Sequence, residues 1–336
     1  MNEFVHDYYF WKSKEVAIIG GTGSLGRKLY DLLLAFNDHM NLKGVRIISR
    51  DEYKQWKMKN DFEEFSDKLN TSYIIGDVRD LERMKLALRG VDVLINCSAM
   101  KQIGSCEQNP FEAVQTNIIG SMNVIKSALE CGVERVIHIS TDKAVYPVNL
   151  YGDTKAVAEK LFTDSQIYCG GNYDTRFSVV RYGNVYGSRG SIVEMIRDAK
   201  KGKGGMLGIT HEDMTRFFIS LNTVANFILH IIPNIDGGCI YVPKMKAIKI
   251  VELFNLLAPG VKVFPIGMRK GEKVHECLVT SEEYSQSISF GDYYQICCED
   301  SGQVDGVDRS IYSNSEFVEV ITKDDIERWE GDEVLV

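Results

Sequence analysis

Short apolar runs alternate with longer helical stretches over the first half of the chain. The apolar runs lie at residues 15–19, 45–49, 72–75, 91–95, 135–140 and 177–181. Helical patterns at 27–36, 81–88, 111–131 and from Tyr151 onward separate most of them, and residues 97–110 are predicted to form a loop. Strands that alternate with helices in this way are typical of a parallel sheet covered by helices. The pattern therefore predicts an α/β fold with a doubly wound parallel sheet.

The alternation changes after about residue 186. Residues 200–208 are rich in glycine and lysine, which predicts a loop, whereas 222–232 resemble a helix and 239–242 a strand. We expect one large domain over residues 1–190, to which residues 220–245 return. Residues 191–219 and 246–336 would then form a smaller, mixed α/β lobe over the cleft.

A glycine-rich loop joins the first predicted strand to the first helix. Gly20, Gly23 and Gly26 stand in the run Gly20-Gly-Thr-Gly-Ser-Leu-Gly26. In this position glycines permit a tight turn, close approach of a pyrophosphate and close packing of helix on strand. The helix N-terminus adds free N–H groups for phosphate oxygens. We expect a dinucleotide to contact Gly20, Thr22, Gly23, Ser24, Leu25 and Gly26.

The end of the second strand indicates which dinucleotide binds. Arg50 and Asp51 stand where this fold meets the adenosine ribose. An acid there favours NAD, whereas Arg50 and Lys54 favour the 2′-phosphate of NADP. We predict NADP, with NAD as the alternative.

Residues 141–155 carry the clearest chemical pattern. Tyr151 and Lys155 are four residues apart, so a helix places them on one face. An ammonium beside a phenol lowers the tyrosine pKa from about 10 toward neutrality, as a general base requires. Asp142 and Lys143 directly follow a strand, at the edge where open sheets bind ligands. The combination suggests redox chemistry coupled to proton transfer.

Composition restricts the partners and the location. The 336 residues carry 39 lysines and arginines against 47 acids, a net charge of −8, which argues against nucleic acid binding. The absence of an apolar run of about 18 residues and of a signal-peptide pattern at the N-terminus favours a cytoplasmic protein without a membrane span. The eight cysteines lack zinc-site spacing, so we expect no metal and free, buried thiols.

Together these motifs resemble those of the extended short-chain dehydrogenase/reductases. The closest resemblance is to UDP-N-acetylglucosamine 4,6-dehydratases of the C5-inverting type, which start pseudaminic acid synthesis. It covers nearly the whole chain and includes ISRDEYKQ at 48–55, GDVRD at 76–80, AMKQI at 99–103, RYGNVYGSRGS at 181–191, MTRFFI at 214–219 and RKGEKVHE at 269–276.

The resemblance implies a Rossmann fold and a reaction in which the cofactor ends as it began. Tyr151 would take the 4-hydroxyl proton during oxidation at C4, with Thr141 orienting the 4-oxygen. Lys143 would remove the C5 proton, Asp142 would protonate the departing 6-hydroxyl, and hydride would return to C6. A lysine that acts as a base must be neutral, so we expect a depressed pKa for Lys143.

The resemblance also implies the binding residues and the assembly. Further cofactor contacts are expected from Asp77, Val78, Ser98, Ala99, Tyr151 and Lys155. UDP-sugar contacts are expected from Lys101, Asn184, Arg216, Arg269 and Glu272, since arginine forks suit diphosphate oxygens. His138, inside an apolar strand, is expected to be structural. The family precedent is a homo-oligomer, a hexamer or at least a dimer.

Three alternatives remain open at this point. The first is a 4,6-dehydratase that retains the C5 configuration. The second is a UDP-sugar 4-epimerase or reductase, which would not need Asp142 and Lys143 for an elimination. The third is a non-catalytic NADP-binding regulator, which could dispense with Tyr151 and Lys155.

Overall fold

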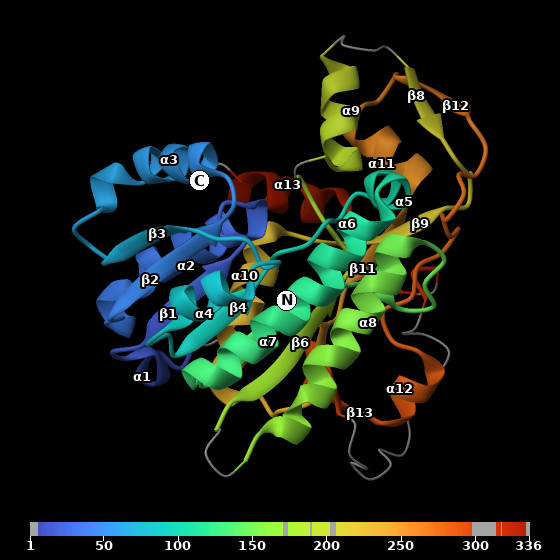
Figure 1. The fold of residues 1–336 in the computed structure, drawn as a ribbon. Coiled ribbons are helices and arrows are strands. Elements are labelled where there is room, and N and C mark those ends of the chain that lie inside the picture. The colour runs from blue at the N-terminus through green and yellow to red at the C-terminus, as the bar shows by residue number, and fades with distance from the viewer. Residues whose placement is uncertain are drawn as a thin grey trace.

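A nine-stranded sheet forms the centre of the computed structural model, which describes residues 6–170, 174–188, 190–201, 206–297, 314–316 and 318–333 (Figure 1). The strand order is β13-β14-β10-β6-β5-β4-β1-β2-β3. The strands of this sheet are β1 (Glu15–Ile19), β2 (Gly44–Ser49), β3 (Thr71–Ile75), β4 (Val93–Asn96), β5 (Arg135–Thr141), β6 (Arg176–Tyr182), β10 (Cys239–Pro243), β13 (Ser287–Ser289) and β14 (Tyr293–Cys297).

The sheet is mostly parallel. β1 pairs with β2 and β4, and β5 pairs with β4 and β6, all in parallel, whereas β14 runs antiparallel to β10. Parallel strands are covered on both faces, which explains why their sequences are continuous apolar runs. All five residues of β1 are buried. The predicted doubly wound α/β fold is confirmed.

Helices lie on both sides of this sheet. α4, α7 and α8 pack together on one side, and α2 and α10 pack together on the other (Figure 1). The helices flanking the main sheet are α1 (Tyr8–Trp11), α2 (Ser24–Met40), α3 (Glu52–Asp61), α4 (Leu81–Leu88), α5 (Ile103–Gln108), α6 (Pro110–Val114), α7 (Gly120–Cys131), α8 (Leu150–Asp164) and α10 (Leu221–Ile231). Short 3₁₀ turns lie at Glu63–Phe65, Asp142–Ala144, Ser165–Tyr168 and Ile232–Asn234. No helix in the described ranges is both long and apolar enough to cross a membrane.

The predicted loop at 97–110 is partly wrong, because it contains α5. Asn109 precedes Pro110, which stands in the first turn of α6, where its missing N–H costs nothing. α6 continues through a π-helical turn at Gln115–Ile119 into α7. The short polar residues of α5 gave no helical periodicity, so this helix was not apparent from the sequence.

A smaller region packs beside the carboxyl ends of the main strands (Figure 1). It contains a three-stranded sheet of β7 (Asn184–Val185), β9 (Thr215–Ile219) and β11 (Lys246–Lys249), and a pair of β8 (Met206–Ile209) with β12 (Lys262–Pro265). Its helices are α9 (Ile192–Lys200), α11 (Ile250–Leu257) and α13 (Lys323–Glu333), whereas α12 (Ser281–Ser285) lies near β13 and packs against the main core (Figure 1). A separate apolar cluster that includes Val193, Phe254 and Trp329 forms its core.

Two details bear on the expected organisation. Of the predicted loop at 200–208, residues 206–208 belong to β8, while 202–205 lie outside the described residues. β13 and β14 come from the segment expected in the lobe but pair within the main sheet. The proposed domain bounds stay a prediction.

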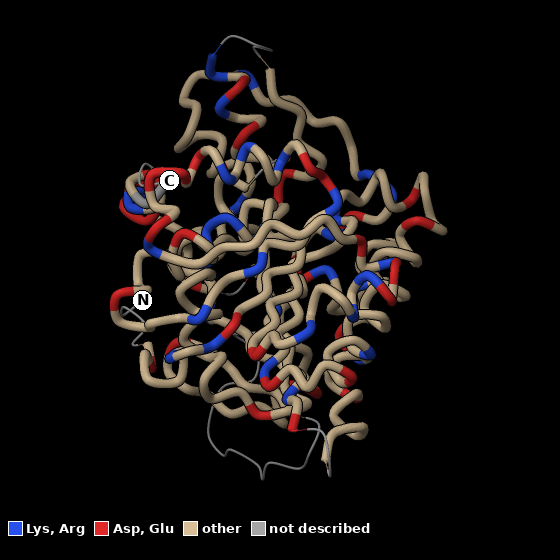
Figure 2. Tube along the Cα trace, turned by 60° about the vertical axis from the view of Figure 1, so that its left-hand side comes forward, with Lys and Arg blue, Asp and Glu red and all other residues tan. Residues whose placement is uncertain are grey.

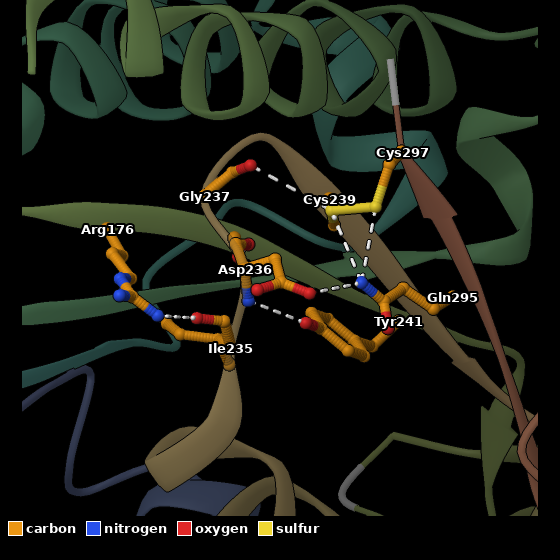
Figure 3. Close-up of a disulfide and its surroundings, with 9 residues drawn as sticks. Arg176, Ile235, Asp236, Gly237, Cys239, Tyr241, Gln295 and Cys297 are labelled. Atoms are coloured by element: carbon orange, nitrogen blue, oxygen red, sulfur yellow. Dashed lines mark hydrogen bonds between the residues drawn. A yellow bond between two sulfur atoms is a disulfide. The ribbon is translucent and has the colours of Figure 1, made fainter. Parts of the chain in front are cut away.

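The expectation that all cysteines are free is wrong for one pair. Cys239 and Cys297 lie opposite each other where β10 pairs with β14, and they form a disulfide (Figure 3). The two residues are 58 positions apart. Because strand register is set by the whole sheet, spacing along the chain could not reveal this pair. Five other cysteines are free, and Cys298 lies outside the described residues.

Candidate active site

A cleft of about 990 Å³ lies at the carboxyl ends of the main strands, beside the smaller region. Open α/β sheets bind ligands at this edge. The predicted site residues that line it are Gly20, Thr22, Gly23, Ser24, Leu25, Gly26, Arg50, Lys54, Val78, Ser98, Ala99, Lys101, Lys143, Asn184, Arg216, Arg269 and Glu272. Thr141, Asp142, Tyr151 and Lys155 are buried in the elements next to this cleft. Asp77 is not part of the lining, because Arg79 holds its carboxylate at 2.7 Å.

The glycine loop has the form that a pyrophosphate requires. Gly20 has φ +76°, and a Cβ there would lie 3.0 Å from the backbone of Cys97. A Cβ on Gly26 would lie 2.5 Å from the Cα of Gly21, so the helix packs on the strand turn only with glycine. Gly23 is the N-cap of α2, whose first N–H groups have no partner within the helix. The loop is therefore a cradle for a phosphate group.

The charged side chains of Arg50 and Asp51, at the end of β2, have different roles. Asp51 caps α3, since its carboxylate accepts from the N–H of Lys54 at 3.0 Å. That hydrogen bond lowers the pKa of Asp51. Arg50 is more than half exposed and lies 3.8 Å from Asp77. Asp51 thus has a structural role in the helix cap, and it also lines the cleft beside Arg50 and Lys54.

Tyr151 lies in the first turn of α8, beside Thr141 and Asp142. Asn149 fixes the start of this helix by accepting from the N–H of Gly152 at 2.9 Å. Burial raises the pKa of Tyr151 to about 12, although the charge of Lys143 and a hydrogen bond with Thr141 oppose the rise. The expected lowering of this pKa by Lys155 is not found.

Lys155 is instead engaged by β5. Its Nζ lies 2.7 Å from Nε2 of His138 and 2.5 Å from the carbonyl oxygen of Ile139. Burial lowers the pKa of Lys155 to about 8, against the pull of Glu159. The sequence placed Lys155 on the face of Tyr151 but gave no sign of its partner on the neighbouring strand.

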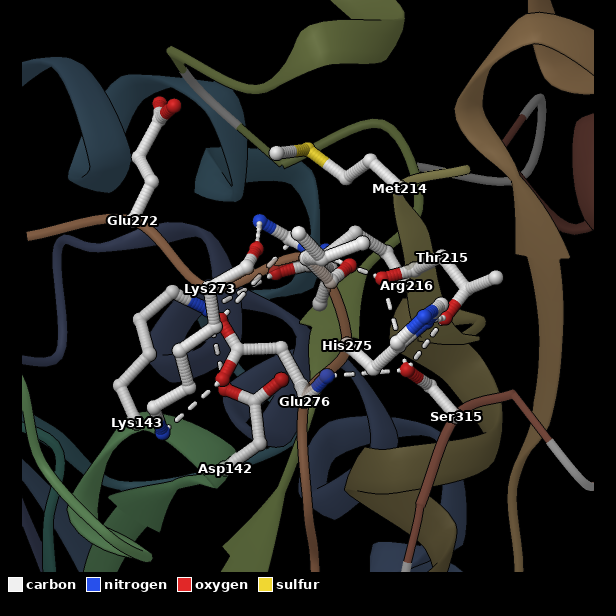
Figure 4. A network of polar contacts seen from close by, with 12 residues as sticks. Asp142, Lys143, Met214, Thr215, Arg216, Glu272, Lys273, His275, Glu276 and Ser315 are labelled. Atoms are coloured by element: carbon white, nitrogen blue, oxygen red, sulfur yellow. Dashed lines mark hydrogen bonds and ion pairs between the residues drawn. The ribbon is translucent and has the colours of Figure 1, made fainter. Parts of the chain in front are cut away.

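Lys143 lies in a network of charges at the end of β5 (Figure 4). Its Nζ donates to Asp142 Oδ1 at 3.0 Å and to Asn184 Oδ1 at 3.3 Å, and it lies 3.7 Å from Glu276 Oε1. Burial lowers the pKa of Lys143, but the carboxylates of Asp142 and Glu276 outweigh it, so the pKa is raised. The expected depressed pKa is therefore wrong for the protein without ligands.

Glu276 is a buried residue of this network that sequence reasoning did not select. Besides Lys143, it lies 3.3 Å from Lys273 Nζ and 3.9 Å from Arg216 Nε (Figure 4). Within the described residues, Asp142 Oδ2 is buried without a hydrogen-bond partner, and Glu276 Oε2 makes no hydrogen bond although Lys273 Nζ lies 3.3 Å from it. Such groups are rare in folded proteins and call for an explanation. The available signal was the motif RKGEKVHE, from which only Arg269 and Glu272 were chosen.

The expected substrate residues differ in how firmly they are held. Arg216 donates to the carbonyl oxygens of Thr215 at 2.7 Å and Lys273 at 2.9 Å, so its guanidinium is fixed in place. Arg269 is two-thirds exposed and 4.0 Å from Glu272. The lining of the cleft therefore includes Arg216, whose guanidinium is held by backbone carbonyls, and Arg269, whose side chain faces solvent.

The fold and cleft are those of a short-chain dehydrogenase/reductase, and comparison with known proteins defines the family. Residues 16–298 match the model described as "Polysaccharide biosynthesis protein", and the chain belongs to this family. It is 42% identical over 286 residues to the UDP-N-acetylglucosamine 4,6-dehydratase (inverting) of Campylobacter jejuni subsp. jejuni, covering 85% of this chain and 83% of the relative. The resemblance inferred from the motifs is confirmed.

Two other relatives complete the comparison. The chain is 39% identical over 288 residues to the UDP-glucose 4-epimerase of Rickettsia canadensis, covering 84% of this chain and 82% of that one. Among solved structures, Pen from Bacillus thuringiensis has a TM-score of 0.87 and 32% identity, covering 97% of this chain and 99% of that one. The fold therefore extends over nearly the whole length.

Proposed function

We propose that this chain is a UDP-N-acetylglucosamine 4,6-dehydratase, a lyase that forms a 4-keto-6-deoxy sugar nucleotide with inversion at C5. The observation that carries the proposal is the ion pair of the buried Asp142 and the half-buried Lys143 beside Tyr151. An elimination across C5–C6 needs a proton acceptor and a proton donor in addition to the tyrosine. The 42% identical relative of that name supports the same assignment.

A nicotinamide dinucleotide fits the chain's glycine loop. The cradle at Gly20 and Gly26 and the N-terminus of α2 suit its pyrophosphate. The exposed guanidinium of Arg50, with the cation Lys54 also lining the cleft, supports NADP over NAD. When bound, this cofactor supplies reversible hydride acceptance.

The protein's own groups handle the protons. Tyr151 takes the 4-hydroxyl proton, and Thr141 orients the oxygen through the hydroxyl that also bonds Asp142 at 2.9 Å. The C5 proton then passes to Lys143, and Asp142, whose carboxylate accepts from Lys143 at 3.0 Å, relays a proton from it to the 6-hydroxyl, which leaves as water. Because Asp142 and Glu276 raise the pKa of Lys143, this lysine rests as an ammonium. It must lose that proton before it acts as a base, so elimination should become faster as pH rises.

The second candidate is a UDP-sugar 4-epimerase, favoured by the 39% identical relative with that name. An epimerase returns hydride to C4 and needs no proton transfer at C5. Retention at C5 would be a further variant of the dehydratase. The product distinguishes both the epimerase and the retaining dehydratase from the proposed enzyme.

The test uses the purified protein and UDP-N-acetylglucosamine without added reductant. We expect complete conversion with no lasting absorbance of reduced cofactor, because hydride returns to the sugar. A product of L-arabino configuration supports inversion at C5. A D-xylo product would support the dehydratase assignment but contradict inversion at C5. Lasting, stoichiometric NADPH, or a product still bearing its 6-hydroxyl, would contradict the proposal.

The setting of this activity is proposed from the sequence and the family resemblance. We expect a cytoplasmic homo-oligomer, a hexamer or at least a dimer, that binds no nucleic acid. Positions of basic and acidic residues are scattered over the trace in Figure 2, and the full sequence has a net charge of −8. Light scattering of the purified protein measures the oligomer directly.

A further inference from the structure

Two buried hydroxyl groups lie where three distant segments of the chain meet, beside the Lys143 cluster (Figure 4). They belong to Thr215, on β9, and to Ser315, in the described stretch 314–316. The third segment is residues 273–277, which pairs with the stretch 314–316 through an isolated antiparallel bridge. Thr215 is 5% exposed and Ser315 3%, so both hydroxyls must find their partners within the protein.

Ser315 binds both polar backbone atoms of Glu276. Its N–H donates to the carbonyl oxygen of Glu276 at 2.9 Å, and the N–H of Glu276 donates to Ser315 Oγ at 2.9 Å. Two hydrogen bonds to one residue fix the orientation of the Glu276 backbone, whereas a single bond would allow it to pivot. They therefore determine the direction in which the side chain of Glu276 projects.

Thr215 in turn fixes the hydroxyl of Ser315. The two hydroxyl oxygens are 2.6 Å apart, and Thr215 Oγ1 lies 2.8 Å from His275 Nδ1. When the neutral ring of His275 accepts at Nδ1, Thr215 donates to it and accepts from Ser315, so each hydroxyl donates once. The result is an unbroken line of hydrogen bonds from the backbone of Glu276 to the imidazole.

The anchored side chain of Glu276 stands between two cations without a hydrogen bond to either. Its Oε1 lies 3.7 Å from Lys143 Nζ and 3.9 Å from Arg216 Nε, beyond hydrogen-bonding distance. Lys273 Nζ is 3.3 Å from Oε2, likewise without forming a hydrogen bond. The backbone anchor, rather than a hydrogen bond to any of these cations, therefore places the carboxylate.

The same threonine also anchors Arg216. The N–H of Thr215 donates to the carbonyl oxygen of Val274 at 3.1 Å. Arg216 Nη1 donates to the carbonyl oxygens of Thr215 and Val274 at 2.7 and 3.0 Å. The guanidinium expected to meet the diphosphate and the carboxylate beside Lys143 therefore share Thr215 as an anchor.

We propose that Ser315 and Thr215 are positioning residues, which hold Glu276 beside Lys143 so that this lysine can keep the proton it takes from C5. This inference rests on the proposed function, in which Lys143 passes that proton through Asp142 to the departing 6-hydroxyl. Neither hydroxyl-bearing residue is among those that line the cleft, so both act on the site through Glu276.

The charges around Lys143 show why the place of Glu276 matters. Burial lowers the pKa of Lys143, but the carboxylates of Asp142 and Glu276 outweigh it, and Arg216 opposes them. Asp142 is the neighbour of Lys143 in the chain, so its effect does not depend on Ser315. Moving the carboxylate of Glu276 away by ~2 Å, at an effective dielectric constant of about 20, should lower the pKa of Lys143 by about one unit.

The direct test measures how much of Lys143 is uncharged in the cofactor-free protein, which needs no turnover. Only the neutral amine reacts with acetic anhydride, and mass spectrometry gives the labelling of Lys143 relative to the exposed Lys57. At about pH 8, below the raised pKa of Lys143, a fall of this pKa by about one unit makes labelling about tenfold faster. We expect this increase in Ser315→Ala, and the wild-type rate in Ser315→Thr, which keeps the hydroxyl.

A double-mutant cycle shows whether Ser315 acts through Glu276. Glu276→Gln should accelerate the labelling of Lys143 to a similar extent, and Ser315→Ala should add nothing in that background. Thr215→Val removes the second hydroxyl at nearly constant shape and should act in the same direction, which covers the case that Ser315→Ala does not fold. An unchanged rate in both hydroxyl variants, or an equal further acceleration on top of Glu276→Gln, would overturn the inference.

Ser178→Ala is the matched control. It removes a buried hydroxyl that donates to the carbonyl oxygen of Asp236 at 2.6 Å, outside the cleft lining, so stability should fall while the labelling of Lys143 stays. In the assay of elimination, the rising limb should move toward lower pH in Ser315→Ala as in Glu276→Gln. Faster labelling of Lys143 in Ser315→Ala, in a protein that forms no dehydrated product, would reject the proposed function and leave the positioning of Glu276 standing.

Discussion

Two clusters of charged residues, one around Arg181 and one around Lys143, differ in how completely their polar atoms are hydrogen-bonded. Around Arg181, all five N–H groups donate: to both oxygens of Glu159, both of Glu283 and the carbonyl of Leu278 at 2.7–3.0 Å. Around Lys143, Asp142 Oδ2 is buried with no hydrogen bond within the described residues, and Glu276 Oε2 faces Lys273 Nζ at 3.3 Å without forming one. The first cluster is closed and the second is open.

The difference distinguishes a cluster that stabilises the fold from a cluster that can take part in a reaction. The Arg181 cluster joins β6, α8 and α12, and a charge buried this deeply is tolerated only when it is fully paired. The Lys143 cluster borders the cleft, and the unbonded oxygen of Asp142 can serve a ligand there. We therefore expect substitutions in the closed cluster to affect folding and those in the open cluster to affect turnover.

The largest expected effect is on the reaction when Lys143 is replaced. Lys143→Ala should lower product formation by ~10²–10⁴-fold, the usual contribution of a general base, while reversible oxidation at C4 continues. Tyr151→Phe should abolish both steps. Rapid-scan absorbance of the reduced cofactor together with product analysis distinguishes the two variants. Near-normal product formation by Lys143→Ala would remove this lysine from the mechanism.

Breaking the closed cluster should cost stability. Arg181→Met leaves Glu159 and Glu283 buried without their partner, so we expect the free energy of unfolding to fall by about 3–5 kcal/mol. Urea unfolding followed by circular dichroism measures the change, with Lys143→Ala as the comparison of small effect. A loss below about 1 kcal/mol in Arg181→Met would contradict the distinction between the two clusters.

Cofactor selection should depend on Arg50 at the far end of the cleft. Arg50→Ala removes a charge-assisted contact with the 2′-phosphate, so NADP binding should weaken by ~1.5–3 kcal/mol and NAD binding much less. Titration calorimetry with both dinucleotides gives the two constants. Lys57→Ala, which removes an exposed cation of the following helix α3 that does not line the cleft, is the control. Equal losses for NADP and NAD would reject the assignment.

The smallest expected effect is a shift in pH dependence caused by Glu276. The carboxylates of Glu276 and Asp142 raise the pKa of Lys143, and the base must be neutral. Glu276→Gln should therefore lower this pKa and move the rising limb of the elimination rate about one unit toward lower pH. Glu272→Gln changes a carboxylate at the rim and should leave the limb in place. A shift toward higher pH would show that Glu276 does not stabilise the ammonium.

The sequence predicted what depends on local pattern. The strands at 15–19 and 135–140, the glycine loop and the helix carrying Tyr151 and Lys155 are present, because each follows from a short run of residues. Contacts between distant segments were not accessible. The pairing of Cys239 with Cys297 depends on sheet register, and the raised pKa of Lys143 depends on Glu276, more than a hundred residues away, as well as on the adjacent Asp142. The partner of Lys155 was missed for the same reason, since His138 lies on a neighbouring strand.

The most direct test of the central claim, that the open cluster performs an elimination at C5, is the fate of the C5 hydrogen. Wild-type protein is incubated with UDP-N-acetylglucosamine in deuterated water, and the product sugar is analysed by NMR. The account predicts a 6-deoxy-4-keto sugar with solvent deuterium at C5, and the loss of this exchange in Lys143→Ala. A product that keeps its original C5 hydrogen would contradict it.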